Sequence, residues 1–200
     1  MGQGKGKKPA TYEDIEELPF GWVAERLEDE LYASPRPAFG RLRVEFRRGS
    51  LLTLPFERAQ GGPGGWWFLD EPELHFRTHV VVPALAGWRR ERVPEPSNPE
   101  TPWPTEAPDW VCEVLSPFTW NTDRMRKLPL YHVEGVRHAW VIDPLRRTLG
   151  VFRSGLSGWE QASLHQGNDT VLAEPFDTVP LRLGLLWLPE KRGREGPTAP

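Results

Sequence analysis

Residues 109–117 read DWVCEVLSP, in which an acidic side chain stands in the middle of an apolar run. The neighbours of Glu113 on the two sides are Val-Cys and Val-Leu pairs, and such a short apolar run is typical of a buried strand. An ionised carboxylate in apolar surroundings is costly unless something pairs with it. The pattern therefore predicts a partner for Glu113, and both a structural cation and a metal ion are open candidates.

Asp123, Lys127 and Tyr131 follow at intervals of four residues, and on a continuous helix they would form one stripe. The ordinary interpretation of this spacing is an i,i+4 ion pair beside a core tyrosine. The chemical interpretation is a cation brought next to Glu113. Lys127 is the only lysine of the chain that does not lie in its terminal tails, and an ammonium is a compact point charge whose pKa can be tuned.

The elements that must position these residues are predicted from apolar periodicity and turn signals. The first half of the chain is predicted to contain a short helix over 11–18, a hairpin over 22–34 turning at Glu28-Asp29, a helical stretch over 39–58, and strands over 66–76 and 79–88 joined at Arg77-Thr78. A Pro-rich loop over 93–108 and a strand over 110–115 follow. The last part is predicted to contain a helical stretch within 121–134, capped by Asn121, Thr122 or Asp123, and short strands near 137–142, 148–153, 158–164 and 170–174. Pro129 predicts that the regular part of the last helix begins only near Leu128. This mixed order predicts an α/β or α+β fold around one sheet.

The composition of the 200 residues, 38% hydrophobic and 26% charged, predicts one globular domain over residues 11–190 between disordered tails at 1–10 and 191–200. A formal net charge of −3 excludes a global basic field, so any contact with nucleic acid needs a local basic groove. The single cysteine, Cys112, excludes an internal disulfide. No run approaches the 18 apolar residues of a membrane span, and we expect a cytoplasmic protein without a membrane partner.

A longer motif block surrounds the candidate residues. It comprises Glu113-Val114-Leu115-Ser116-Pro117, then Asp123, Lys127 and Tyr131, then Gly135-Val136, Trp140 and Asp143-Pro144. In this block, residues 107–153 resemble the Uma-two family of "putative restriction endonucleases" within the PD-(D/E)XK nuclease superfamily, and a weaker resemblance extends over 11–187. The resemblance implies a restriction-endonuclease-like core, namely a mixed sheet with flanking helices, here with an N-terminal hairpin.

The resemblance also implies an activity and roles. The expected activity is endonucleolytic hydrolysis of DNA phosphodiesters with Mg²⁺ or Mn²⁺, with Glu113 as metal ligand, Lys127 as catalytic cation, and Asp123 and Tyr131 in support. The superfamily's usual lysine would stand at Leu115, two residues after the glutamate, whereas the family resemblance places it at Lys127. Cleavage of two strands favours a homodimer, although no residue of the sequence indicates one.

Two positions depart from the family pattern. The family usually has a histidine on the helix near residues 39–46, whereas no histidine of this chain precedes His75. The family has aspartate in a stretch of the type VVPDLAGWR, and here Ala84 takes its place in VVPALAGWR. A methyl group cannot bind a metal. If Arg77-Thr78 is a two-residue hairpin turn, Glu71 falls opposite Ala84 and Glu73 opposite Val82, on one face. We hypothesise that Glu71 or Glu73 supplies the missing ligand. The alternative is that both are edge-strand charges facing solvent.

Two functions therefore remain open at the level of sequence. In the first, the chain is an active metal-dependent endonuclease, and Glu113 is ionised and partly wet. In the second, the chain is a catalytically inactive relative that serves as a binding or regulatory module, and Glu113 simply pairs with Lys127. Ala84 favours the second function, whereas the Glu113/Lys127 pair favours neither.

Overall fold

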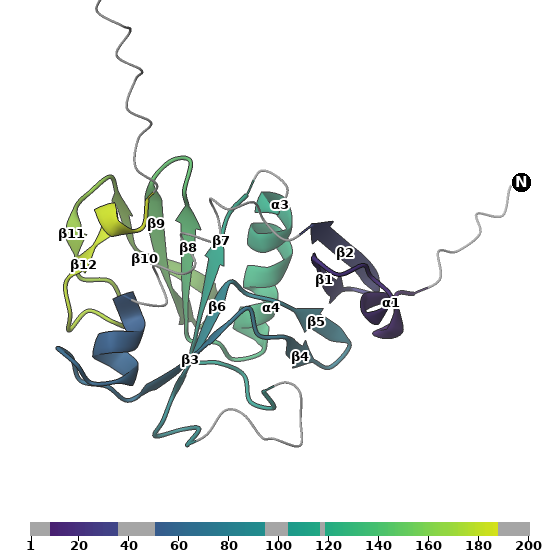
Figure 1. Cartoon of the computed structure of the whole chain (residues 1–200), viewed down its shortest axis with the longest axis horizontal. Coiled ribbons are helices and arrows are strands. Elements are labelled where there is room, and N and C mark those ends of the chain that lie inside the picture. The colour runs from purple at the N-terminus through teal and green to yellow at the C-terminus, as the bar shows by residue number, and fades with distance from the viewer. Residues whose placement is uncertain (1–8, 36–50, 95–103, 117–118, 188–200) are drawn as a thin grey trace, which may run out of the picture.

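The computed structural model describes residues 9–35, 51–94, 104–116 and 119–187. Its central sheet contains β3 (Trp66–Asp70), β6 (Leu85–Arg89), β7 (Trp110–Val114), β8 (His138–Asp143), β9 (Thr148–Gly155) and β10 (Gly158–Gln166). These six strands lie in the order β10-β9-β8-β7-β6-β3 (Figure 1). The pair β7–β8 is parallel, and the other neighbouring pairs of this sheet are antiparallel. The predicted mixed α+β class is confirmed.

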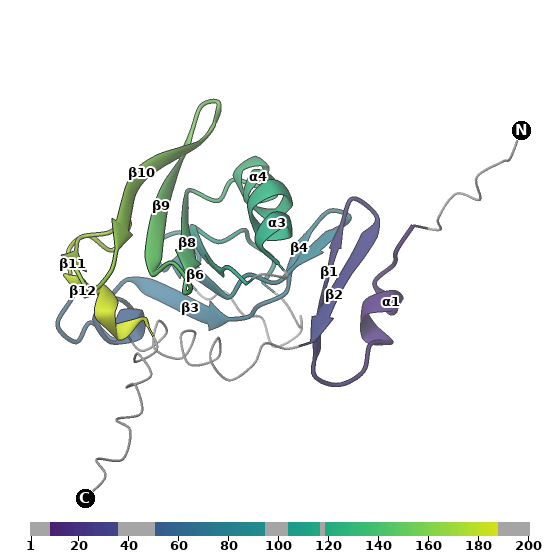
Figure 2. The ribbon, with the colours of Figure 1, turned by 90° about the horizontal axis from the view of Figure 1, so that it is seen from above.

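A four-stranded sheet lies beside the central one, in the order β2-β1-β5-β4. Its strands are β1 (Trp22–Leu27), β2 (Glu30–Pro35), β4 (Leu74–Phe76) and β5 (His79–Val81). The predicted turn at Glu28-Asp29 is confirmed, since Leu27 pairs with Glu30 and both turn residues have left-handed backbones. Figure 2 shows this β1–β2 hairpin next to β4 and α3 (Trp120–Thr122), at the opposite end of the molecule from β11 (Thr170–Val171) and β12 (Leu181–Arg182).

The parallel pair β7–β8 requires a crossover connection, and the chain supplies it with a helical segment over one face of the sheet. This segment comprises α3, η2 (Asp123–Lys127) and α4 (Leu128–Val133). On that face, Val111 of β7 packs in one core cluster with Leu128 and Tyr131 of the helix. On the opposite face, Trp110 and Cys112 pack in a second cluster, which includes Phe56 of η1 (Thr53–Glu57) and Phe176. The side chains of β7 thus alternate between the two faces of the sheet, as expected of a strand.

The prediction of two continuous strands over 66–76 and 79–88 is wrong, because each of these segments forms two shorter strands. Residues 66–70 and 85–89 pair in the central sheet, and residues 74–76 and 79–81 pair in the smaller one. Pro72 and Pro83 lie in the two breaks, and a proline has no N–H to donate to a ladder. The predicted turn at Arg77-Thr78 is confirmed, with Phe76 opposite His79.

The remaining elements are short. The predicted N-terminal helix is α1 (Glu13–Glu16), and η3 (Leu183–Leu185) follows β12 without having been predicted. Of the helical stretch predicted over 39–58, residues 39–50 lie outside the described residues, while residues 51–52 are helical and lead directly into η1. Most of the predicted tails and residues 95–103 of the predicted loop also lie outside them. No described helix is long and apolar enough to cross a membrane.

Phe176 lies at the centre of an aromatic cluster between the central sheet and η1. Its ring centroid is 4.8–5.6 Å from those of Phe56, Trp66, Phe68, Trp110 and Trp140. We expect Phe176→Ala to destabilise the fold by about 3–5 kcal/mol, because it removes buried aromatic surface and leaves a cavity. A thermal melt should show a fall in Tm of roughly 6–20 °C. Leu156→Ala, at a fully exposed turn, is the control and should leave Tm unchanged.

Candidate functional site

The ammonium of Lys127 lies among three carboxylates in the interior. Its Nζ is 2.6 Å from Glu25 Oε1, 2.8 Å from Glu113 Oε1 and 3.5 Å from Asp123 Oδ1. It also donates a hydrogen bond of 3.1 Å to the carbonyl of Val82. The side chains of Lys127 and Glu113 are only 2% and 1% exposed. The partner predicted for Glu113 is thus a buried lysine.

The crossover brings Lys127 over Glu113 because the helix covers the face to which Glu113 points. In the middle of this helix, η2 is a π-helical turn, in which the N–H of Leu128 donates to the carbonyl of Asp123. Pro129 has no N–H to return to the carbonyl of Met125, so the turn before it can widen. The regular helix α4 begins at Leu128, as predicted.

The predicted helix cap is wrong. The helix begins at Trp120, so Asn121, Thr122 and Asp123 lie inside it. The N–H of Thr119 instead donates a hydrogen bond of 3.1 Å to Ser116 Oγ, one turn before the predicted start. Asp123 is consequently free to turn its carboxylate inward, and it is 2% exposed.

Glu25 of β1 is the site residue that sequence reasoning missed. Its Oε1 accepts the N–H of Val82 at 2.7 Å while it contacts Lys127. Val82 can offer both its N–H and its carbonyl to side chains because the break at Pro83 removes this stretch from the ladder. The signal was present, since Val23, Glu25 and Leu27 alternate along one face of the predicted hairpin.

Tyr131 completes the cluster, because its hydroxyl donates a hydrogen bond of 2.7 Å to Glu113 Oε1. Burial, reinforced by the charge of Glu113, raises the pKa of Tyr131 well above its usual value, so the phenol keeps its proton. The predicted residues Glu113, Asp123, Lys127 and Tyr131 are therefore brought together in one cluster. Their chemical roles stay predictions.

Charge within the cluster is unequally balanced, since one ammonium serves three carboxylates. Burial alone would lower the pKa of Lys127, but the charges of Glu113, Glu25 and Asp123 outweigh it and raise that pKa above its usual value. Burial raises the pKa of Glu113 from 4.5 to about 7, against the attraction of Lys127. Lys127 thus stays protonated, while Glu113 is the carboxylate of the cluster that takes up a proton most readily.

A cleft opens beside the cluster, with an empty volume of about 420 Å³ that includes the solvent at its mouth. Its ionisable lining residues are Glu25, Glu71, Asp123 and Lys127, and Ala84 also lines it. Glu71, one of the two residues hypothesised to supply the missing ligand, therefore lies at the cleft. Glu73 is engaged elsewhere: it accepts a 2.9 Å hydrogen bond from Tyr12 and lies 3.2 Å from His75.

Two buried oxygens of the cluster, Glu113 Oε2 and Asp123 Oδ2, have no hydrogen-bond partner in the described part of the chain. Buried carboxylate oxygens of this kind are costly unless a cation or a donor meets them. Among the described residues, no group of three or more His, Cys, Asp or Glu side chains is arranged to hold a metal ion. Mg²⁺ commonly takes only one or two carboxylates and completes its shell with water and substrate phosphate. The donor set therefore fits a hard divalent cation held by two carboxylates.

The fold and this arrangement of side chains define a restriction-endonuclease-like α+β protein. The fold is similar to that of a crystal structure described as "a putative nuclease belonging to DUF820" from Anabaena variabilis. The TM-score is 0.69 at 22% sequence identity, over 89% of this chain and 97% of that one. A comparison with curated proteins finds no match.

The family model described as "Uma2: Putative restriction endonuclease" matches residues 9–183. The chain belongs to this family, and the resemblance drawn from its motif block is confirmed. The matched region includes every residue of the cluster around Lys127, together with Glu71 and Ala84.

Removal of the lysine charge should unfold the protein more readily. We expect Lys127→Met to lower the free energy of unfolding by about 3–5 kcal/mol, because three buried carboxylates lose their cation. Arg126→Met is a matched control, since the neighbouring cation pairs with Glu28 at the surface and such pairs contribute about 0–1 kcal/mol. Urea unfolding of both variants measures the difference, and equal losses would contradict a buried role for Lys127.

The pH dependence of stability should carry the signature of Glu113. Its native pKa is raised from 4.5 to about 7, so the folded state binds this proton more tightly than the unfolded state. Its contribution to stability is therefore largest at low pH and falls as pH rises from 4.5 to about 7. Glu113→Gln abolishes this term. The stability of the parent relative to Glu113→Gln, measured in urea at pH 5 and pH 8, should fall over that interval, and a constant difference would refute the assignment.

Proposed function

We propose that this chain is a divalent-metal-dependent endonuclease that hydrolyses DNA phosphodiesters. The observation that carries the proposal is the pair of buried, unpartnered oxygens, Glu113 Oε2 and Asp123 Oδ2, beside a single lysine that serves three carboxylates. Such a cluster has excess negative charge and open oxygen ligands, which are the two properties that a Mg²⁺ site needs. Membership of the Uma2 family supports the choice of nuclease chemistry and of DNA.

Glu113 and Asp123 would hold the metal ion, which extends the supporting role first assigned to Asp123. When bound, Mg²⁺ or Mn²⁺ supplies a Lewis acid for the scissile phosphate and lowers the pKa of a water nucleophile. Lys127 lies at the cleft and would stabilise the negative charge that develops on the phosphate oxygens. Glu25 and the carbonyl of Val82 would keep its ammonium at the cleft. Tyr131 would orient Glu113 through their hydrogen bond.

The proposal extends to DNA duplexes, whose two strands require two cuts. The described part of the chain offers one such cluster, so cleavage of both strands favours two copies acting together. Light scattering of the chain on a short duplex would detect this homodimer.

A second function is favoured by one observation. Ala84 lies buried at the cleft. It stands where the resemblance drawn from the sequence implies an aspartate. In this alternative the chain is a catalytically inactive nuclease-fold module that binds or regulates, and the pairing of Glu113 with Lys127 serves only stability.

A cleavage assay separates the two functions. The parent chain, Glu113→Gln and Ala84→Asp are incubated with supercoiled plasmid and with single-stranded DNA, in Mg²⁺ or Mn²⁺. We expect cleavage by the parent and a loss of at least about 100-fold in Glu113→Gln, because one metal ligand and its charge are removed. A parent without activity beside an active Ala84→Asp would instead establish the inactive module. Thermal melts verify that each variant is folded.

A further inference from the structure

Glu71 and Ala84 are neighbours across the end of one antiparallel ladder. Asp70 of β3 pairs with Leu85 of β6, and the next pair along this register is Glu71 with Ala84. The N–H of Glu71 points to the carbonyl of Ala84 at 3.5 Å. Neighbouring strands lie about 4.8 Å apart. A carboxylate lost from position 84 can therefore be replaced from position 71 by a side chain one methylene longer than aspartate.

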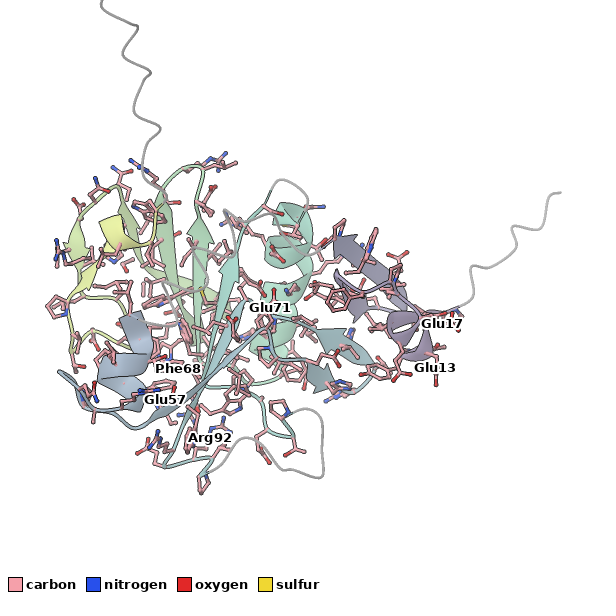
Figure 3. The ribbon with its side chains drawn as sticks, in the orientation of Figure 1. Glu13, Glu17, Glu57, Phe68, Glu71 and Arg92 are labelled. Carbon is pink, nitrogen blue, oxygen red and sulfur yellow. The ribbon has the colours of Figure 1, made fainter. Side chains whose placement is uncertain are left out.

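The side chain of Glu71 lines the same cleft as Ala84, Asp123 and Lys127. Figure 3 draws the half-buried Glu71 beside the helical crossover in this view, whereas Glu13 and Glu17 lie at the end of the molecule that carries α1. Glu73, two residues further on, instead pairs with Tyr12 and His75. Of the two acidic residues between β3 and β4, the one opposite Ala84 is thus the one at the cleft.

The backbone of Glu71 is itself unusual. Its φ of +45° is left-handed, a conformation that glycine or asparagine adopts at lower cost, and the next residue is Pro72. A glutamate is therefore held where backbone preference alone would select another residue. Such outliers support a functional hypothesis when the side chain has a use at that place.

The cleft is also lined by a carboxylate, Asp123, that has an unpaired oxygen among the described residues. Asp123 Oδ2 is buried and lacks a hydrogen-bond partner among the described residues, and Asp123 lines the cleft together with Glu71. The two carboxylates thus border one space, and one of them has a buried oxygen without a hydrogen-bond partner among the described residues.

We infer that Glu71 is a metal-ligating residue of this site and replaces, from the adjacent strand, the carboxylate that position 84 lacks. The inference rests on the proposed function, which it deepens by adding Glu71 to Glu113 and Asp123. Since no three such side chains are already arranged to hold an ion among the described residues, the side chain of Glu71 would have to turn toward the other two when the metal binds. It also explains how Ala84 and a working site can occur in one chain, because the acid has moved across the ladder while its place in the cleft is retained.

Mn²⁺ binding to the full chain, measured by titration calorimetry without DNA, tests the inference independently of activity. Loss of an outer-shell partner already weakens metal binding 10–100-fold, so Glu71→Gln should weaken Mn²⁺ binding at least about tenfold. Glu73→Gln is the matched control, because it removes the same charge from a residue that does not line the cleft. This variant should bind Mn²⁺ as tightly as the parent. Glu71→Asn, which tolerates the left-handed backbone, is measured in parallel in case the glutamine variant misfolds.

The double variant Glu71→Gln/Ala84→Asp is the decisive comparison. A return of Mn²⁺ affinity to within a few-fold of the parent would show that one carboxylate serves from either strand. Parent-like affinity in both Glu71 variants, beside a loss in Glu113→Gln, would overturn the inference and leave the proposed function standing. Absence of Mn²⁺ binding by the parent would overturn both.

Discussion

A single buried ammonium joins four separate parts of this chain. Lys127 contacts Glu25 of β1, Glu113 of β7, Asp123 of its own helix and the backbone of Val82 between β5 and β6. Each of these groups would be costly to bury alone, and each is acceptable because the others are present. The relation of the smaller sheet to the central one thus depends on charge as well as on apolar packing.

Irregular backbone, rather than regular structure, gives this cluster its shape. The π-helical turn before Pro129 brings Asp123 and Lys127 onto the inner face of the helix. The breaks at Pro72 and Pro83 leave a backbone N–H and a carbonyl of Val82 for Glu25 and Lys127. Departures from ideal geometry therefore gather at the place where the chemistry is proposed, as expected when local preference is sacrificed for a site.

Much of this arrangement could be predicted from the sequence, because it follows from local rules. The turn at Arg77-Thr78 and the period of two fix which residues lie opposite each other, and that register places Glu71 opposite Ala84 even across the two breaks. The apolar residues around Glu113 indicated a partner, and Lys127, the one lysine outside the tails, was a candidate beside a metal ion. These inferences needed only strand geometry and the cost of burying a charge.

What could not be predicted depends on contacts between distant segments. Glu25 looked like an ordinary polar position in a hairpin, and only the docking of that hairpin on the helix reveals its contact with Lys127. The division of the 66–89 segment between two sheets was hidden as well. A proline shows where a ladder must stop, but the direction that the chain takes afterwards is set by what it packs against.

The position of Glu25 determines how this molecule can be divided. The β1–β2 hairpin resembles an appendage at one end of the ribbon (Figure 2), and it would be a natural place to shorten the chain. Its removal would take away the closest carboxylate to Lys127 and uncover one wall of the cleft, which Val23 and Ser34 also line. The smallest part of the chain that keeps this cluster and its cleft intact therefore includes the N-terminal hairpin.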